Sequence, residues 1–268
     1  MISGPLLRRT WRAHRLRVLV LTLALGAWGF LMPVIYATFG IQMEAIIKAG
    51  IIPQAFLRLL GADPFSLSGA VALGSVHPVA LGLQLAYPVG FAAVAIAGER
   101  QRGTLEVLLS RPISRRAVFA TLLLAITAFA ALTTAGQLLG VAFGALAFDV
   151  ADRLDPAQLV FLGLNTVALL VALAAVCLAA SSSFDRAGTP IASGLALVIG
   201  GYVLEVLGTL WPDAAFLQPY SPFHYLRPMQ IMAGRAAPTD LVVLAAIGVV
   251  AIAFGLWRFP RRDLAAPT

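Results

Sequence analysis

Six stretches of the chain run for about 17 to 29 residues with at most one charged side chain each. A helix that crosses a bilayer needs about 20 apolar residues, because each residue advances about 1.5 Å across a hydrocarbon core of about 30 Å. The stretches lack the polar–apolar alternation of barrel strands, and a helix satisfies its own backbone polar groups in lipid. We therefore predict an all-α integral membrane protein, one membrane domain over residues 1–268, with spans at about 18–39, 78–97, 117–145, 157–181, 190–210 and 241–257.

The composition excludes a soluble globule. Hydrophobic residues make up 60% of the 268 residues and charged residues only 12%, against about 25% charged in soluble domains. The single cysteine, Cys177, cannot form an internal disulfide, and no Cys/His cluster has zinc-ligand spacing. We expect no metal site in this chain.

The formal net charge of +7 could indicate nucleic acid, but the distribution of the charges indicates a lipid bilayer instead. Six spans place most of the 19 basic residues on the side of both termini, and basic loops stay cytoplasmic. We therefore predict cytoplasmic N and C termini and no nucleic-acid partner. The basic residues on that side are Arg8, Arg9, Arg12, Arg15, Arg17, Arg100, Arg102, Arg111, Arg115, Arg116, Arg186, Arg258, Arg261 and Arg262; Lys48, Arg58, Arg153, Arg227 and Arg235 fall on the other.

The N-terminal stretch, residues 1–17, has the pattern of a basic amphipathic helix. Leu6, Leu7 and Trp11 fall on one side, and arginines fall on the other. Such a helix lies in the membrane interface with its arginines at anionic headgroups. It either anchors the chain or also contacts a cytoplasmic partner. The arginines of this interfacial helix are Arg8, Arg9, Arg12 and Arg15.

The connection between the second and third spans predicts a short cytoplasmic helix. We expect Gly98 and Gly103 to interrupt the helix, and Thr104 to cap a helix of one to two turns that ends near Ser110. Leu105, Leu108 and Leu109 make this helix partly apolar. An exposed leucine pair on a rigid helix favours docking of another protein.

Two long connections lie on the outer side. The first, residues 40–77, shows a helical pattern at 41–52 and a short amphipathic piece at 54–60. The second, residues 211–240, is rich in proline and aromatic residues. It either dips into the outer interface or caps the bundle as an ordered loop.

The run GERQRGTLEVLLSRPISRR at residues 98–116 resembles the cytoplasmic loop of the permeases of ATP-binding-cassette transporters of the type-2 exporter family (ABC-2 type). The matching parts are Gly98-Glu99, then Gly103-Thr104-Leu105-Glu106, and then Ser110 to Arg115. The outer stretch from Ser221 to Tyr225 is similar to the family's segment before the last span. The long first outer connection departs from the family pattern.

This resemblance implies a transport subunit that is not itself an enzyme. Two permease subunits, identical or different, would pair with two cytoplasmic ATPase subunits in a bacterial or archaeal inner membrane. ATP and Mg²⁺ would bind to the ATPases, and this chain indeed lacks the GxxxxGK[ST] phosphate-binding motif. The residues implied to lie in or beside the ATPase groove are Glu99, Arg100, Gly103, Thr104, Leu105, Glu106, Leu108 and Leu109. On this reading, Leu105→Asp or Glu106→Arg uncouples transport and leaves the membrane fold intact.

Three polar residues within the spans are candidates for a pathway or gate: Glu205, Asn165 and Gln84. Glu205 is either an acid near the outer interface or a pathway residue. Gln84 and Asn165 fit interhelical hydrogen bonds better than substrate ligands. Gly136, Gly140 and Gly144 form a GxxxGxxxG pattern that lets helices approach closely, within one subunit or at a dimer seam.

Three classes of function compete. The permease half of an ATP-driven exporter explains the short cytoplasmic helix. A secondary transporter or channel would use Glu205 as its ion site and leaves that helix unexplained. An intramembrane enzyme would need convergent catalytic residues, and the sequence contains no HExxH or GxSxG motif. The identity of the substrate stays open.

Overall fold

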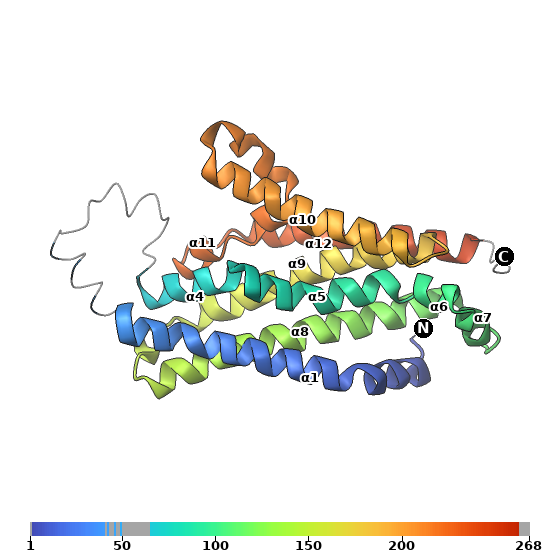
Figure 1. Ribbon diagram of the computed structural model, residues 1–268, viewed down its shortest axis with the longest axis horizontal. Helices are drawn as coiled ribbons and strands as arrows, with labels where there is room; N and C mark the ends of the chain where they lie inside the picture. Colours follow the sequence, from blue (N-terminus) through green and yellow to red (C-terminus); the bar gives the residue numbers. More distant parts are fainter. Residues whose placement is uncertain (1, 41, 43–45, 47–48, 50–64, 263–268) are drawn as a thin grey trace.

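The computed structural model describes residues 2–40, 42, 46, 49 and 65–262. The described part contains helices and no strands, and it forms one elongated bundle (Figure 1). Its long helices are α1 (Gly4–Ile35), α5 (Pro78–Val94), α8 (Arg115–Ala147), α9 (Pro156–Ser183), α10 (Gly188–Leu210) and α12 (Pro238–Arg261). The short ones are α4 (Leu67–Val76), α6 (Ala97–Gln101), α7 (Thr104–Leu109) and α11 (Pro228–Met232), with a π-helical turn at Tyr36–Gly40 and 3-10 turns η2 (Ala151–Arg153), η3 (Pro212–Tyr220) and η4 (Pro222–Tyr225).

Within the described residues, five helices are long and apolar enough to cross a bilayer, and a bent pair makes a sixth. That pair is α4 and α5, which meet at 49°. His77 between them is extended, with φ −60° and ψ 136°, because the residue before a proline is pushed out of the helical region and Pro78 follows. α5 begins at Pro78, the predicted start of the second span, and ends at Val94, while the unpredicted helix α4 precedes it.

The predicted outer connection at 40–77 is wrong in its last part, which forms the buried helix α4. Ser66 caps this helix by accepting a hydrogen bond from the N–H of Gly69 at 3.0 Å. Most of the predicted helical pattern at 41–52, and all of the predicted piece at 54–60, lies outside the described residues.

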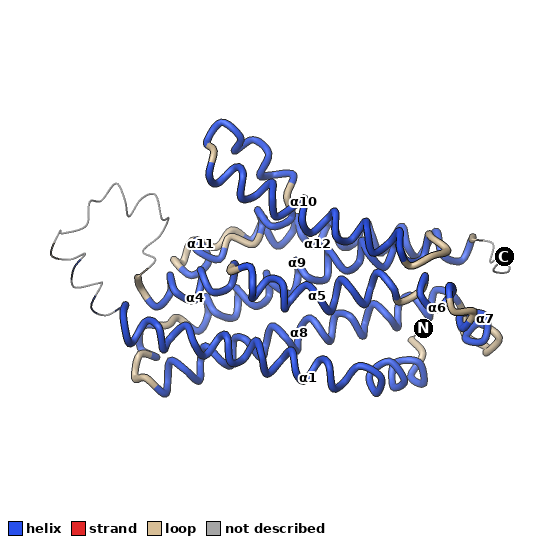
Figure 2. The backbone as a smooth tube through the Cα atoms, in the orientation of Figure 1, coloured by secondary structure: helices blue, strands red, loops and turns tan. Residues whose placement is uncertain are grey.

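The two ends of the bundle differ. α6 and α7 lie at the end where α1 begins and α12 finishes, hereafter the terminal end (Figure 1). α4, α11 and the far end of α1 lie at the other, hereafter the opposite end. The tube in Figure 2 shows that helices run most of the distance between the ends, with a break between α4 and α5.

α8 and α9 form the centre, since 61% of the most apolar stretch of each is buried, compared with 17% for α10. α1 packs along α8 through small residues. A Cβ atom built on Gly140 would overlap the carbonyl oxygen of Gly26, and one built on Gly144 would lie 2.8 Å from the carbonyl oxygen of Phe30. Gly136 lies against the same helix, so the GxxxGxxxG face of α8 packs within one subunit.

α1 runs without a break from Gly4 through residue 17 into the apolar stretch. No helix end therefore separates the predicted interfacial stretch from the predicted first span. Leu6 and Thr10 are buried, and Trp11 is 41% exposed while its ring stacks on Phe129 at 5.7 Å. Arg8, Arg9, Arg12 and Arg15 are all exposed.

Candidate functional site at the terminal end of the bundle

The connection between α5 and α8 is built from two short helices, α6 and α7. Its start is fixed to α9, where the buried hydroxyl of Ser181 accepts hydrogen bonds from the N–H groups of Ile96 and Ala97 at 3.1 and 3.0 Å. Gly103 then turns the chain with φ 68°, in the left-handed region that glycine adopts without a Cβ penalty. The two helices α6 and α7 are thus set at a fixed angle and attached to the bundle core, and we call them together the angle piece.

Glu99 holds the two short helices together. Its carboxylate accepts a hydrogen bond from the Thr104 hydroxyl at 2.6 Å and another from the Arg102 guanidinium at 2.9 Å. Burial acts to raise the pKa of Glu99, but these two hydrogen bonds and the charges of Arg102 and Arg9 outweigh it, so the pKa lies below its ordinary value. The carboxylate is therefore ionised at neutral pH and accepts both bonds.

Two details of the predicted short helix are wrong. Gly98 lies inside α6 and does not interrupt that helix. The N-cap of α7 is Gly103, and Thr104 is its first helical residue. The Thr104 side chain bonds back to Glu99 and leaves the α7 N–H groups uncapped by a side chain.

The leucines of α7 face the bundle, which contradicts the predicted exposed pair. Leu105 is 2% exposed and belongs to the main hydrophobic core, and Leu108 and Leu109 are half-buried against it. The outward face of α7 consists of Glu106 and Val107, of which Val107 is 66% exposed. A period-3.6 pattern on so short a helix does not show which side meets the core.

Arg100 points into the protein. Its Nη1 atom lies 2.8 Å from Oδ1 of Asp185, in the turn between α9 and α10, and its side chain is 13% exposed. The same carboxylate oxygen accepts a hydrogen bond from Nη2 of Arg262 at the end of α12. Arg115 at the start of α8 donates to the carbonyl oxygen of Pro260 at 3.3 Å. Asp185 and Arg262 escaped sequence reasoning, because no local pattern links residues so far apart in the chain.

A pocket of about 290 Å³ separates α1 from the angle piece. Arg9 and Thr10 of α1 line it on one side, and Glu99, Arg102 and Leu108 line it on the other. The structure therefore brings one of the predicted interfacial arginines next to the predicted coupling residues. Arg8 and Arg12 lie on a different hollow, around the start of α1.

An apolar groove of about 380 Å³ runs between α5 and α10. Gly82, Ala86 and Gly90 form an open strip on α5, and nothing lies within 4 Å of a Cβ built on either glycine. Tyr202 and Phe223 line the groove as well. Its walls offer shape and apolar contact, with no charged side chain among its lining residues.

A family model described as ABC-2 family transporter protein matches residues 12–264 of the chain. The chain belongs to the ABC-2 transporter family. It is a multi-pass membrane permease, and the family associates with ABC ATPase components. No curated protein matches the chain.

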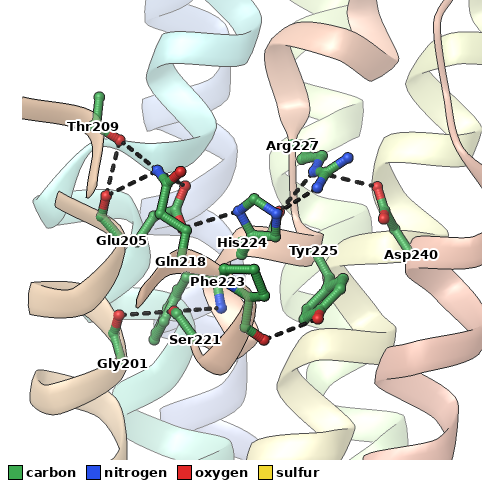
Figure 3. Close-up of polar contacts among 11 residues, drawn as sticks. Gly201, Glu205, Thr209, Gln218, Ser221, Phe223, His224, Tyr225, Arg227 and Asp240 are labelled. Carbon is green, nitrogen blue, oxygen red and sulfur yellow. Dashed lines mark hydrogen bonds and ion pairs between the residues drawn. The ribbon is translucent and has the colours of Figure 1, made fainter. Parts of the chain in front are cut away.

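At the opposite end of this ABC-2 permease, Glu205 meets the connection between α10 and α12 (Figure 3). Its carboxylate lies 3.4 Å from Nε2 of Gln218 and 3.4 Å from Nδ1 of His224. Arg227 contacts His224 and lies 3.7 Å from the carboxylate of Asp240. Burial and the charge of Arg227 lower the pKa of His224, against the opposing effect of Asp240.

The two uncharged polar candidates join elements of the permease to one another. Gln84 is 2% exposed, and its amide nitrogen donates a hydrogen bond to the side-chain oxygen of Gln137 in α8. Asn165 is 1% exposed and donates to the carbonyl oxygens of Tyr225 and Leu226, both at 2.8 Å. Neither side chain lines the α5–α10 groove.

The described part of the permease holds no group of three or more His, Cys, Asp or Glu side chains that could bind a metal ion. The clusters of charged side chains described above lie near the two ends of the bundle. The terminal end carries the angle piece, and the opposite end carries the Glu205 cluster. The candidate functional site consists of the angle piece and the apolar groove between α5 and α10.

Proposed function

We propose that this chain is the membrane-spanning subunit of an ATP-driven exporter, and that separate ATPase subunits bind its α6–α7 angle piece. The terminal end would then face the cytoplasm of a bacterium or archaeon. The observation that carries the proposal is the construction of the angle piece. Two short helices, fixed in angle and attached to the core, connect α5 to α8, although a loop of a few polar residues would be enough for that connection.

A contact that transmits force must resist bending. The Glu99–Thr104 bond, the left-handed turn at Gly103 and the burial of Leu105 all fix α7 relative to α6. The exposed Glu106 and Val107 are then presented on a rigid support. Such an arrangement suits the docking of a rigid partner, because little conformational entropy is lost on binding.

The groove supports an apolar pathway between two permease subunits. Only 17% of the most apolar stretch of α10 is buried, and the open strip of Gly82, Ala86 and Gly90 on α5 allows the close approach of another helix. Two copies, or this chain and a related one, would enclose the pathway and pair with two ATPases. ATP and Mg²⁺ would bind to those ATPases.

Glu205 serves the proposed exporter as a structural contact. Its carboxylate is engaged by Gln218 and His224, and it lies outside the lining of the groove. A secondary transporter with Glu205 as its ion site finds no support in this arrangement.

The test is ATP-dependent export by the permease expressed with its proposed ABC ATPase. Glu106→Arg reverses a charge on the outward face of α7, whereas the matched control, Asp152→Arg, reverses an exposed charge at the opposite end. We expect Glu106→Arg to lower both ATPase co-purification and export, while Asp152→Arg changes neither.

Normal ATPase binding and normal export by the Glu106→Arg protein would refute the proposal, as would export that continues at full rate without any ATPase. Leu105→Asp is unsuitable for this test, because its target side chain lies in the core of the permease.

A further inference from the structure

Asp185 joins three parts of the permease that are distant in sequence. It lies in the short turn between α9 and α10, and its Oδ1 atom meets Arg100 of α6 and Arg262 at the end of α12. The two arginine side chains are 13% and 12% exposed, whereas the Asp185 side chain is 61% exposed. One carboxylate at the surface thus serves two largely buried guanidinium groups.

The charge balance makes Asp185 the group on which this cluster depends. Two guanidinium groups that share one oxygen repel each other, and the repulsion is stronger where water is excluded. Burial lowers the pKa of Arg262, and Arg100 and Arg258 lower it further, while Asp185 acts in the opposite direction. Without the carboxylate, Arg100 and Arg262 would separate.

A second contact ties the same turn to α6. The side-chain oxygen of Gln101 accepts a hydrogen bond from the N–H of Ala187 at 3.0 Å. Consecutive residues of α6, Arg100 and Gln101, therefore hold two positions of one turn, and α10 begins immediately after it at Gly188.

α10 is freer to move than the helix on the other side of that turn. Its most apolar stretch is 17% buried, compared with 61% for α9. The start of α6 is bonded to Ser181 of α9, so a displacement of its other end, at Arg100 and Gln101, moves the start of α10 more readily than the end of α9. Because α10 forms one wall of the apolar groove, its displacement changes the width of the groove.

We propose that Asp185 is a positioning residue that passes movement of the α6–α7 angle piece to α10 through its contact with Arg100. Arg262 holds the same carboxylate to the end of α12. The source of the movement rests on the proposed function, but the mechanical link between α6 and α10 belongs to this chain alone. The link requires the ion pair between Arg100 and Asp185 to stay intact while α6 moves.

The first test uses the full-length permease in lipid nanodiscs without a partner. Spin labels are placed on Val107→Cys in α7 and Ala192→Cys in α10, both exposed positions, in a Cys177→Ala background. We expect a narrow distribution of label-to-label distances. Asp185→Asn and Arg100→Gln should each broaden it, and the double variant should be no broader than either single one, because both remove one contact.

Two variants separate positioning from general structural damage. Asp185→Glu keeps the charge and should restore most of the narrow distribution. Arg186→Gln changes the exposed neighbour of Asp185 and should leave the distribution unchanged. An unchanged distribution in Asp185→Asn would overturn the proposal, and so would additive broadening in the double variant.

The second test uses the complex with its ATPase. Asp185→Asn should retain ATP hydrolysis and reduce the molecules exported per ATP by about tenfold, within the usual range of coupling between sites. Normal export per ATP in that variant would overturn the link. Broadened distances in a permease that no ATPase drives would instead leave the link standing and remove the proposed function.

Discussion

A single methyl group added at Gly140 should separate α1 from α8, whereas the same change at Gly82 should be harmless. A Cβ on Gly140 would overlap the carbonyl oxygen of Gly26 and lie 3.0 Å from its Cα atom. Both obstacles are backbone, so no side-chain rotation relieves them and the helices must move apart. A Cβ on Gly82 has nothing within 4 Å.

The magnitude follows from two opposing effects. Overpacking of a tight contact costs about 1–3 kcal/mol, and a backbone obstacle places Gly140→Ala near the upper limit, at about 3 kcal/mol. Alanine is favoured over glycine in a helix by about 1 kcal/mol. Gly140→Ala should therefore destabilise the fold by about 2 kcal/mol, and Gly82→Ala should be neutral or stabilise it by up to about 1 kcal/mol.

The assay is reversible unfolding of the purified permease in mixed micelles by increasing SDS, under conditions where the chain is monomeric. The free energy of unfolding is compared among wild type, Gly140→Ala and Gly82→Ala. A Gly140→Ala protein as stable as wild type would refute the packing of α1 on α8. So would a loss of stability confined to Gly82→Ala.

Three further outcomes follow from the described contacts. Leu105→Asp should lower the free energy of unfolding by at least about 3 kcal/mol, because it removes a buried leucine and buries a carboxylate. Val107→Asp should change the free energy of unfolding by no more than about 0.5 kcal/mol, because its side chain is exposed. Equal effects of the two substitutions in the same SDS titration would contradict the orientation of α7. Asn165→Ala should lower the free energy of unfolding by about 1–3 kcal/mol, because two buried carbonyl oxygens lose their donor; unchanged stability would show that water replaces the amide. The pKa of Glu99 is lowered in the folded protein, so the stability that its carboxylate contributes is fully present above its unfolded pKa and is lost as the pH falls through its folded pKa. Amide exchange in α7, corrected for its intrinsic pH dependence, should therefore rise as the pH falls through this range in wild type and stay flat in Glu99→Gln. Parallel exchange profiles in the two proteins would show that the bond to Thr104 does not hold α7.

The spans were predictable because bilayer thickness fixes the length of an apolar run. Each of the six expected stretches overlaps a helix that starts or ends within a few residues of the predicted bounds. Helix α4 was not predicted, because residues 40–77 were assigned to an outer connection. The signal was present: the chain carries no charge between Asp63 and Glu99, a distance sufficient for a bent span.

The details of the site depended on information that the sequence does not carry locally. Gly103 and Thr104 both suit the start of a helix, and only the left-handed turn at Gly103 decides between them. The inward face of α7 depends on which neighbours surround it, since the sequence puts its three leucines on one face but does not show whether that face meets the bundle or a partner. The partnership of Arg100 with Asp185 joins residues brought together by the packing of α6 on the turn after α9, and no spacing rule predicts it.

The most direct test of the central claim is site-specific photo-crosslinking of the assembled transporter from Val107, the apolar residue on the outward face of α7. Leu146, near the end of α8 at the opposite end of the bundle, is the matched control, since the two side chains are 66% and 69% exposed. The account predicts that the probe at Val107 captures the ATPase subunit and the probe at Leu146 does not. Failure to capture the ATPase from Val107 in a complex that is active in export would contradict it.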